Sequence, residues 1–95
     1  MEVMLEFEVE KAGLYNLVFY ITKATNYGIY VAELDGNPIG KQMDLYTKSF
    51  HTKDFGAGIH QLSAGTHKLV FKNIGKDDAS GGYGIGIDCL VVAPQ

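Results

Sequence analysis

The side chains that could bind a ligand gather in or directly before three irregular stretches, at residues 23–28, 46–55 and 75–84. An aromatic ring can pack on the apolar C–H face of a sugar, and asparagine or aspartate can hydrogen-bond its hydroxyl groups. The residues that would combine these two kinds of contact are Asn26, Tyr27, Asp44, Tyr46, Phe50 and Tyr83. The alternative is that one or two of these rings only cover the end of a hydrophobic core.

Catalytic and metal-binding patterns are weak. Asp44, Asp77 and Asp78 have the oxygen ligands that calcium prefers, but their spacing does not match a calcium-binding loop, so we interpret them as solvated carboxylates. A glycosidase needs two carboxylates roughly 5–10 Å apart, and nothing in the spacing selects a pair. The single cysteine, Cys89, excludes an intrachain disulfide and is expected to be a small buried side chain. The sequence therefore predicts neither an enzyme nor a cofactor.

Length and composition narrow the class of protein. With 95 residues, 46% of them hydrophobic, the chain is predicted to form a single module spanning residues 1–95, excised from or appended to a larger protein. A net charge of −3 without a basic patch argues against nucleic acid as a partner. No apolar run approaches the roughly 20 residues of a membrane-spanning helix, so no membrane partner is predicted.

The alternation of apolar and polar residues predicts β-strands throughout. It is clearest where His67, Leu69 and Phe71 share one face of a strand and lysines take the other. His67 is expected at the edge of the core, hydrogen-bonded to backbone. The strand at 85–92 is apolar on both faces except at Asp88, which predicts a central strand or a bulge near Asp88. The full set of predicted strands is 2–10, 14–24, 29–34, 39–45, 56–62, 66–74 and 85–92, which indicates an all-β, two-layer antiparallel β-sandwich of roughly seven to eight strands.

Antiparallel strands alternate in direction, so their connections alternate between the two ends of a sandwich. The short turns at 11–13, 35–38 and 63–65 should lie at one end. The longer connections at 23–28, 46–55 and 75–84 should lie together at the other, where they would bring the six candidate residues to one pole. The strand at 14–24 is half apolar on its outward face, at Val18 and Tyr20. This face, or the one with Ile29 and Val31, could instead pack on a partner chain.

Four segments, taken in order, resemble a known family. They are residues 12–17, residues 27–36 with the Asp35-Gly36 turn, residues 62–69, and residues 86–88. Together they are similar to the galactose-binding-like jelly-roll β-sandwiches, which include the family-6 and family-35 carbohydrate-binding modules and domains associated with glycoside hydrolases. Within this group the chain most resembles the hydrolase-associated domains, through residues 26–28 and 44–46.

The resemblance implies a non-catalytic carbohydrate-binding accessory domain, with an extracellular or periplasmic location and a sugar cleft built from loop aromatics at one end of the sandwich. Many such modules hold a structural calcium through a glutamate pair in an extra first segment. Glu6 and Glu8 lie directly before the turn at 11–13 and do not match that pair, so no calcium is predicted. The alternative that the resemblance allows is a structural or oligomerisation jelly-roll domain, with a homo-oligomer or a linked catalytic domain as partner.

Overall fold

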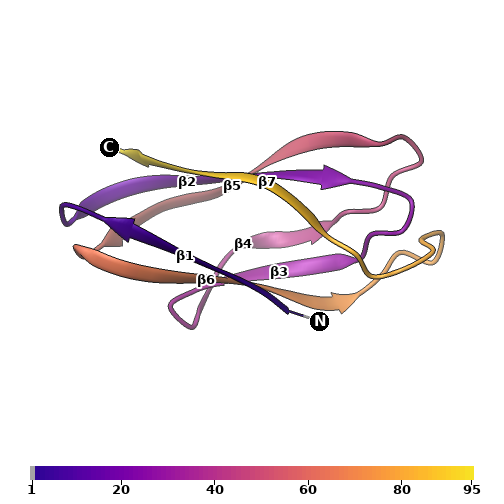
Figure 1. The fold of residues 1–95 in the computed structure, drawn as a ribbon, viewed down its shortest axis with the longest axis horizontal. Coiled ribbons are helices and arrows are strands. Elements are labelled where there is room, and N and C mark those ends of the chain that lie inside the picture. The colour runs from indigo at the N-terminus through magenta and orange to yellow at the C-terminus, as the bar shows by residue number, and fades with distance from the viewer. Residues whose placement is uncertain (1) are drawn as a thin grey trace.

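A computed structural model describes residues 2–95 as seven β-strands in two sheets, without a helix among these residues (Figure 1). One sheet has the order β1-β6-β3-β4 and the other has the order β5-β2-β7, with antiparallel pairing throughout. The two-layer sandwich predicted from the alternation is therefore confirmed. The strands are β1 (Glu2–Val9), β2 (Gly13–Lys23), β3 (Ile29–Leu34), β4 (Asn37–Asp44), β5 (His51–Leu62), β6 (Gly65–Gly75) and β7 (Gly86–Pro94).

The core lies between the two sheets and is made by the inward-facing residues that the alternation indicated. Leu17, Ile21, Leu69 and Phe71 have no exposed surface. The rings of Phe19 on β2 and Phe71 on β6 meet edge to face across the layers, with their centroids 5.1 Å apart. These residues belong to β2 and β6, which have clear period-two patterns. Each of these strands is central in its sheet, because it pairs with a neighbouring strand on both sides.

The outer faces of the two sheets differ. On the four-stranded sheet, glutamates of β1 stand opposite lysines of β6, and Lys72 makes a 3.1 Å ion pair with Glu33. On the three-stranded sheet, Tyr20 is exposed, and so is Cys89, which corrects the prediction of a buried cysteine. Cys89 pairs with Tyr20 across the sheet, so it shares the outward face of that residue. The apolar residues around Cys89 suggested a buried position, but the outer face of this sheet is itself apolar and exposed.

The connections separate into two poles as predicted (Figure 1). The three short turns, which join β1 to β2, β3 to β4 and β5 to β6, lie at the left-hand end in that view, which we call the short-turn pole. The three longer connections lie at the right-hand end. Parallel bridges join Ala24 to Tyr46 and Tyr27 to Gly84, so the longer connections are bonded to one another. We call this end, residues 24–28, 45–50 and 76–85, the long-loop pole.

One detail of the strand prediction was wrong, and the structure decides between two alternatives at Asp88. Residues 51–55 belong to β5 rather than to a loop, because the first four residues of this edge strand are exposed on both faces and show no apolar period. The strand β7 is bulged at Asp88, as one alternative predicted, but it lies at the edge of its sheet rather than at the centre. The Asp88 carboxylate accepts hydrogen bonds from the hydroxyls of Thr22 (3.0 Å) and Thr52 (2.8 Å), and so ties β7 to β2 and β5.

Candidate functional site

The long-loop pole is held together by backbone hydrogen bonds around Gly28. The Gly28 amide donates to the Gly84 carbonyl, and the Gly28 carbonyl accepts from the Leu45 amide, both at 3.0 Å. A Cβ atom at Gly28 would lie 2.6 Å from Nδ2 of Asn73 and 2.9 Å from the carbonyl oxygen of Gly75. Only a residue without a side chain therefore lets the three connections approach this closely.

Two buried hydroxyls fix the connection at 76–85. The fully buried Tyr30 donates its phenolic hydrogen to the Tyr83 carbonyl. Burial raises the pKa of Tyr30, so the hydroxyl keeps its proton and remains a donor. The buried Ser80 hydroxyl lies 2.7 Å from the Tyr27 carbonyl and 2.9 Å from the Gly82 carbonyl. These hydroxyls thus tie the glycine-rich connection to β3 and to the loop at Tyr27.

The structure brings the six candidate residues to one pole but gives them different exposures. Phe50 and Tyr83 are 77% and 51% exposed, and Asn26 and Asp44 are also exposed. Oδ1 of Asp44 accepts a 3.0 Å hydrogen bond from the Tyr46 amide, which closes a local turn. The exposed rings at this pole are therefore those of Phe50 and Tyr83.

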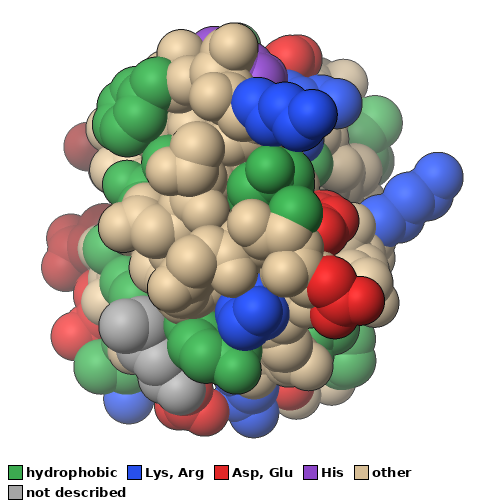
Figure 2. Space-filling view, turned by 90° about the vertical axis from the view of Figure 1, so that its right-hand side faces the viewer, with side chains coloured by type: hydrophobic (Ala, Val, Ile, Leu, Met, Phe, Trp, Pro, Cys, Tyr) green, Lys and Arg blue, Asp and Glu red, His purple; other side chains and the backbone are tan. Residues whose placement is uncertain are grey.

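Tyr27 and Tyr46 are half-buried. The Tyr27 ring packs on the backbone of β7, where a Cβ atom at Gly86 would lie 2.9 Å from the phenolic oxygen. Tyr27 also packs against the core, so part of its ring covers the end of the sandwich. Figure 2 looks onto this pole: its surface is mostly backbone and uncharged polar groups, with hydrophobic side chains scattered between lysines and carboxylates.

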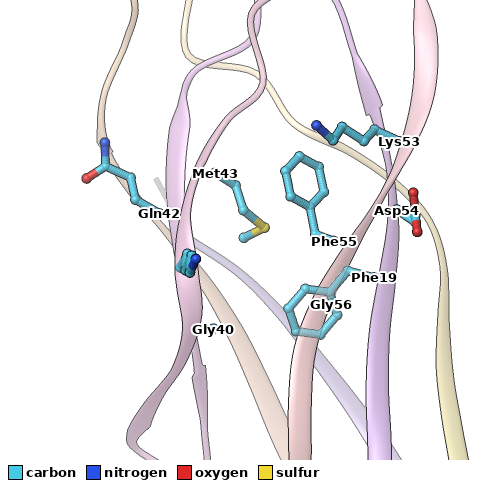
Figure 3. Close-up of a pocket in the computed structure, with 9 residues that line it drawn as sticks. Phe19, Gly40, Gln42, Met43, Lys53, Asp54, Phe55 and Gly56 are labelled. Carbon is cyan, nitrogen blue, oxygen red and sulfur yellow. The ribbon is translucent and has the colours of Figure 1, made fainter.

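A hollow that the sequence analysis missed lies on one side of the sandwich, between the edge strands β4 and β5 (Figure 3). Its volume is about 620 Å³. We call it the lateral groove. The residues that line it are Phe19, Gly40, Lys41, Gln42, Met43, Lys53, Asp54, Phe55 and Gly56. The signal that could have indicated it is the presence of glycines inside both strands, since a glycine in a strand interior often marks a bulge.

The short-turn pole also carries an unpredicted polar cluster. Nδ1 of His67 lies 2.6 Å from the Asp35 carboxylate, and its Nε2 lies 2.8 Å from the Ser63 carbonyl. The other Asp35 oxygen accepts from the Lys68 amide at 2.8 Å, and the His67 ring stacks on Phe7. The expected backbone hydrogen bond of His67 is confirmed. The partnership with Asp35 was not foreseen, because the two residues are 32 positions apart in sequence.

These contacts shift both pKa values. The hydrogen bond to the Ser63 carbonyl, followed by that to Asp35, raises the pKa of His67. The Lys68 amide, followed by His67, lowers the pKa of Asp35. Both shifts favour the charged form of each residue, and each polar side-chain atom of the pair has a hydrogen-bond partner. We therefore interpret the His67–Asp35 pair as a structural link between two turns rather than as a reactive centre.

Within residues 2–95, no three histidine, cysteine, aspartate or glutamate side chains lie close enough to share a metal ion. The same residues include no helix with the length and apolarity needed to span a membrane.

Comparison with solved structures finds the same fold in proteins that act on or bind polysaccharides. A domain of Paenibacillus xanthan lyase matches 99% of this chain with a TM-score of 0.87 and 28% identity, and this region is 9% of the lyase. A ruminal GH26 endo-β-1,4-mannanase matches 99% of the chain, with a TM-score of 0.62, 20% identity and 18% of its own length covered. A family 35 carbohydrate-binding module from Clostridium thermocellum matches 95% of the chain, with a TM-score of 0.56, 24% identity and 69% of its length covered.

No protein-family model and no curated protein sequence matches the chain. The fold is the galactose-binding-like β-sandwich of carbohydrate-binding modules, as the four sequence segments indicated. The solved structures that share this fold include parts of a xanthan lyase and of a mannanase, and the chain spans only a small part of each of these two proteins.

Proposed function

We propose that this chain is a non-catalytic carbohydrate-binding module that belongs to a larger glycan-degrading protein. The observation that carries the proposal is the match over 99% of the chain, at a TM-score of 0.87 and 28% identity, to a domain of a xanthan lyase. The match to a family 35 carbohydrate-binding module supports it at the level of the fold. Such a module acts by holding its linked enzyme on the glycan, which raises the local concentration of substrate.

We infer that the long-loop pole is the glycan-binding surface. The exposed rings of Phe50 and Tyr83 offer apolar faces for a pyranose, and the exposed Asn26 and Asp44 offer hydrogen-bonding groups. Tyr27 and Tyr46 are half-buried and supply ring edges beside them. The hydrogen bonds of Tyr30 and Ser80 support this proposal because a site whose loops are already ordered loses little conformational entropy on binding.

Calorimetry and affinity electrophoresis with xanthan and with β-1,4-mannan test the proposal. We expect binding to at least one of them, and we expect Tyr83→Ala and Phe50→Ala each to weaken it by about tenfold, equivalent to roughly 1.4 kcal/mol. Tyr20→Ala is the matched control, because Tyr20 is an exposed ring on the outer face of β2 and is not one of the residues of the pole. Equal losses in all three variants, or no binding to any polysaccharide, would contradict the proposal.

A second candidate is a structural or oligomerisation domain. The observation that favours it is the apolar outer face of the three-stranded sheet, where Leu14, Tyr20, Ile59 and Val91 are all exposed. Light scattering after size-exclusion chromatography distinguishes the two candidates. A stable dimer that Ile59→Lys dissociates supports the structural domain, and a monomer at 100-fold different concentrations argues against it.

A further inference from the structure

The lateral groove exists because β4 and β5 both depart from regular pairing. In β4, residues 40–42 stand opposite a single residue of β3, and Gly40 has a φ of +68°. In β5, the register shifts by one residue near Gly58, which has a φ of +87°. A Cβ atom at Gly40 would lie 3.5 Å from the Cα of Ala57, so the two sheet edges meet here. Towards the long-loop pole they leave the lateral groove between them.

The floor of the groove is apolar. Phe19 and Met43 are almost fully buried, and Phe55 is half-buried, so part of its ring remains accessible. Figure 3 shows the side chains of Met43 and Phe55 pointing toward one another, with Phe19 below them. A volume of about 620 Å³ over such a floor is within the range of roughly 300–1,000 Å³ that small-molecule sites occupy.

The accessible charges of the groove are positive. Lys53 pairs with Ile21, a core residue, so the lysine side chain has the inward parity of the strand. Its Nζ lies 5.6 Å from the centroid of the Phe55 ring, which is part of the apolar floor. Asp54 pairs instead with the outward-facing Tyr20, and Figure 3 shows its carboxylate pointing away from the groove.

Lys41, on the opposite edge, is a second exposed ammonium group that lines the groove. Among residues 2–95, the ion pairs are Lys72 with Glu33 and His67 with Asp35, so neither groove lysine is neutralised by a carboxylate. Two ammonium groups without a carboxylate partner therefore lie beside an apolar floor. This arrangement complements a ligand that has one apolar face and one negative charge.

We propose that the lateral groove binds an acidic glycan through a uronate residue. The C–H face of the uronate ring packs on Phe55 and Met43, and its carboxylate lies between the ammonium groups of Lys41 and Lys53. This assignment rests on the carbohydrate-binding function proposed above and adds to it a second site and a class of ligand. Its lining residues 40–43 and 53–56 belong to the halves of β4 and β5 that lie nearer the long-loop pole, so the two surfaces are neighbours on the same molecule.

The test uses the 95-residue chain with polyglucuronate and polygalacturonate, each compared with its carboxyl-reduced, neutral form. Calorimetry should show that carboxyl reduction weakens binding at least tenfold, and that added salt weakens binding of the acidic forms. Lys41→Gln and Lys53→Gln should each lower the affinity three- to tenfold. Lys11→Gln, which removes an exposed lysine at the short-turn pole, should leave it unchanged. Phe55→Leu keeps the floor apolar without the ring and should also weaken binding.

Amide chemical shifts locate the site. Titration with the acidic glycan should move the amides of residues 40–43 and 53–56. Shifts confined to the long-loop pole, with an affinity that neither lysine substitution nor carboxyl reduction changes, would overturn the groove proposal and leave the proposed function standing. Self-association of Lys53→Gln with unchanged glycan affinity would also overturn it, because Lys53 would then act as an inward charge that guards the sheet edge. Absence of binding to every acidic and neutral glycan would contradict both proposals.

Discussion

Replacement of Gly28 by alanine tests the packing that creates the long-loop pole. The φ of Gly28 lies outside the left-handed region, so the cost of a side chain here is steric. The new Cβ atom would meet Asn73 at 2.6 Å, the Gly75 carbonyl at 2.9 Å and the Cα of Tyr83 at 3.1 Å. Asn73 has little freedom to withdraw, because its Nδ2 donates to the carbonyls of Ile29 and Gly75. Relief of the clash therefore requires the backbone at 75–83 to move.

Overpacking of this kind costs about 1–3 kcal/mol. For a chain of this length, each kcal/mol lowers the midpoint of thermal unfolding by roughly 4–8 °C, so Gly28→Ala should lower it by about 10 °C. The matched control is Gly56→Ala, because Gly56 also lies outside the left-handed region and a Cβ atom there meets nothing within 4 Å. Thermal unfolding followed by circular dichroism compares the two variants.

Hydrogen exchange of the same variants separates a local change from a global one. We expect faster exchange at the amides of Gly81 and Gly84 in Gly28→Ala, since both amides are bonded across the pole. The reasoning would be refuted if Gly28→Ala unfolded at the same temperature as Gly56→Ala. It would also be refuted if the loss of stability left exchange at these two amides unchanged.

Four further predictions concern individual hydrogen bonds. Because the folded state raises the pKa of His67, protonated His67 stabilises the fold at pH values below the ordinary histidine pKa of 6.5. The free energy of unfolding, measured in urea, should therefore fall as the pH rises from 6.5 to 8.5, and His67→Gln should remove this dependence. Because the folded state lowers the pKa of Asp35, ionised Asp35 stabilises the fold at pH values above the ordinary aspartate pKa of 3.8, and Asp35→Asn should reduce the loss of stability on acidification. If neither variant changes the dependence of stability on pH, the His67–Asp35 pair does not link the turns. Tyr30→Phe should cost about 1 kcal/mol in denaturant and speed proteolysis within residues 76–85, whereas protection of that connection in the variant would show that another contact orders it. Asp88→Ala should cost about 1 kcal/mol or less, because the bonded carboxylate is exposed, and a loss above about 3 kcal/mol would mean that the β7 bulge depends on it.

The sequence predicted the parts of this fold that depend on neighbours along the chain. Alternating side chains located the seven strands, and strand parity placed the long connections at one pole without knowledge of which strands pair. The turn at Asp35-Gly36 was visible for the same reason, since both residues adopt the positive φ angles that this residue pair favours. The candidate residues of the long-loop pole were therefore accessible to prediction, although their exposure was not.

Everything that depends on which strand lies beside which was decided only by the tertiary structure. The apolar run around Cys89 is compatible with a central strand or an edge strand, and only the sheet order shows that this cysteine faces solvent. Phe55 and Lys53 became lining residues of a groove because bulges in two strands of different sheets face each other at Gly40 and Ala57. Periodicity along a strand reports the polarity of its two faces. It contains no information on lateral neighbours, because the hydrogen bonds that pair strands come from a backbone that every residue shares.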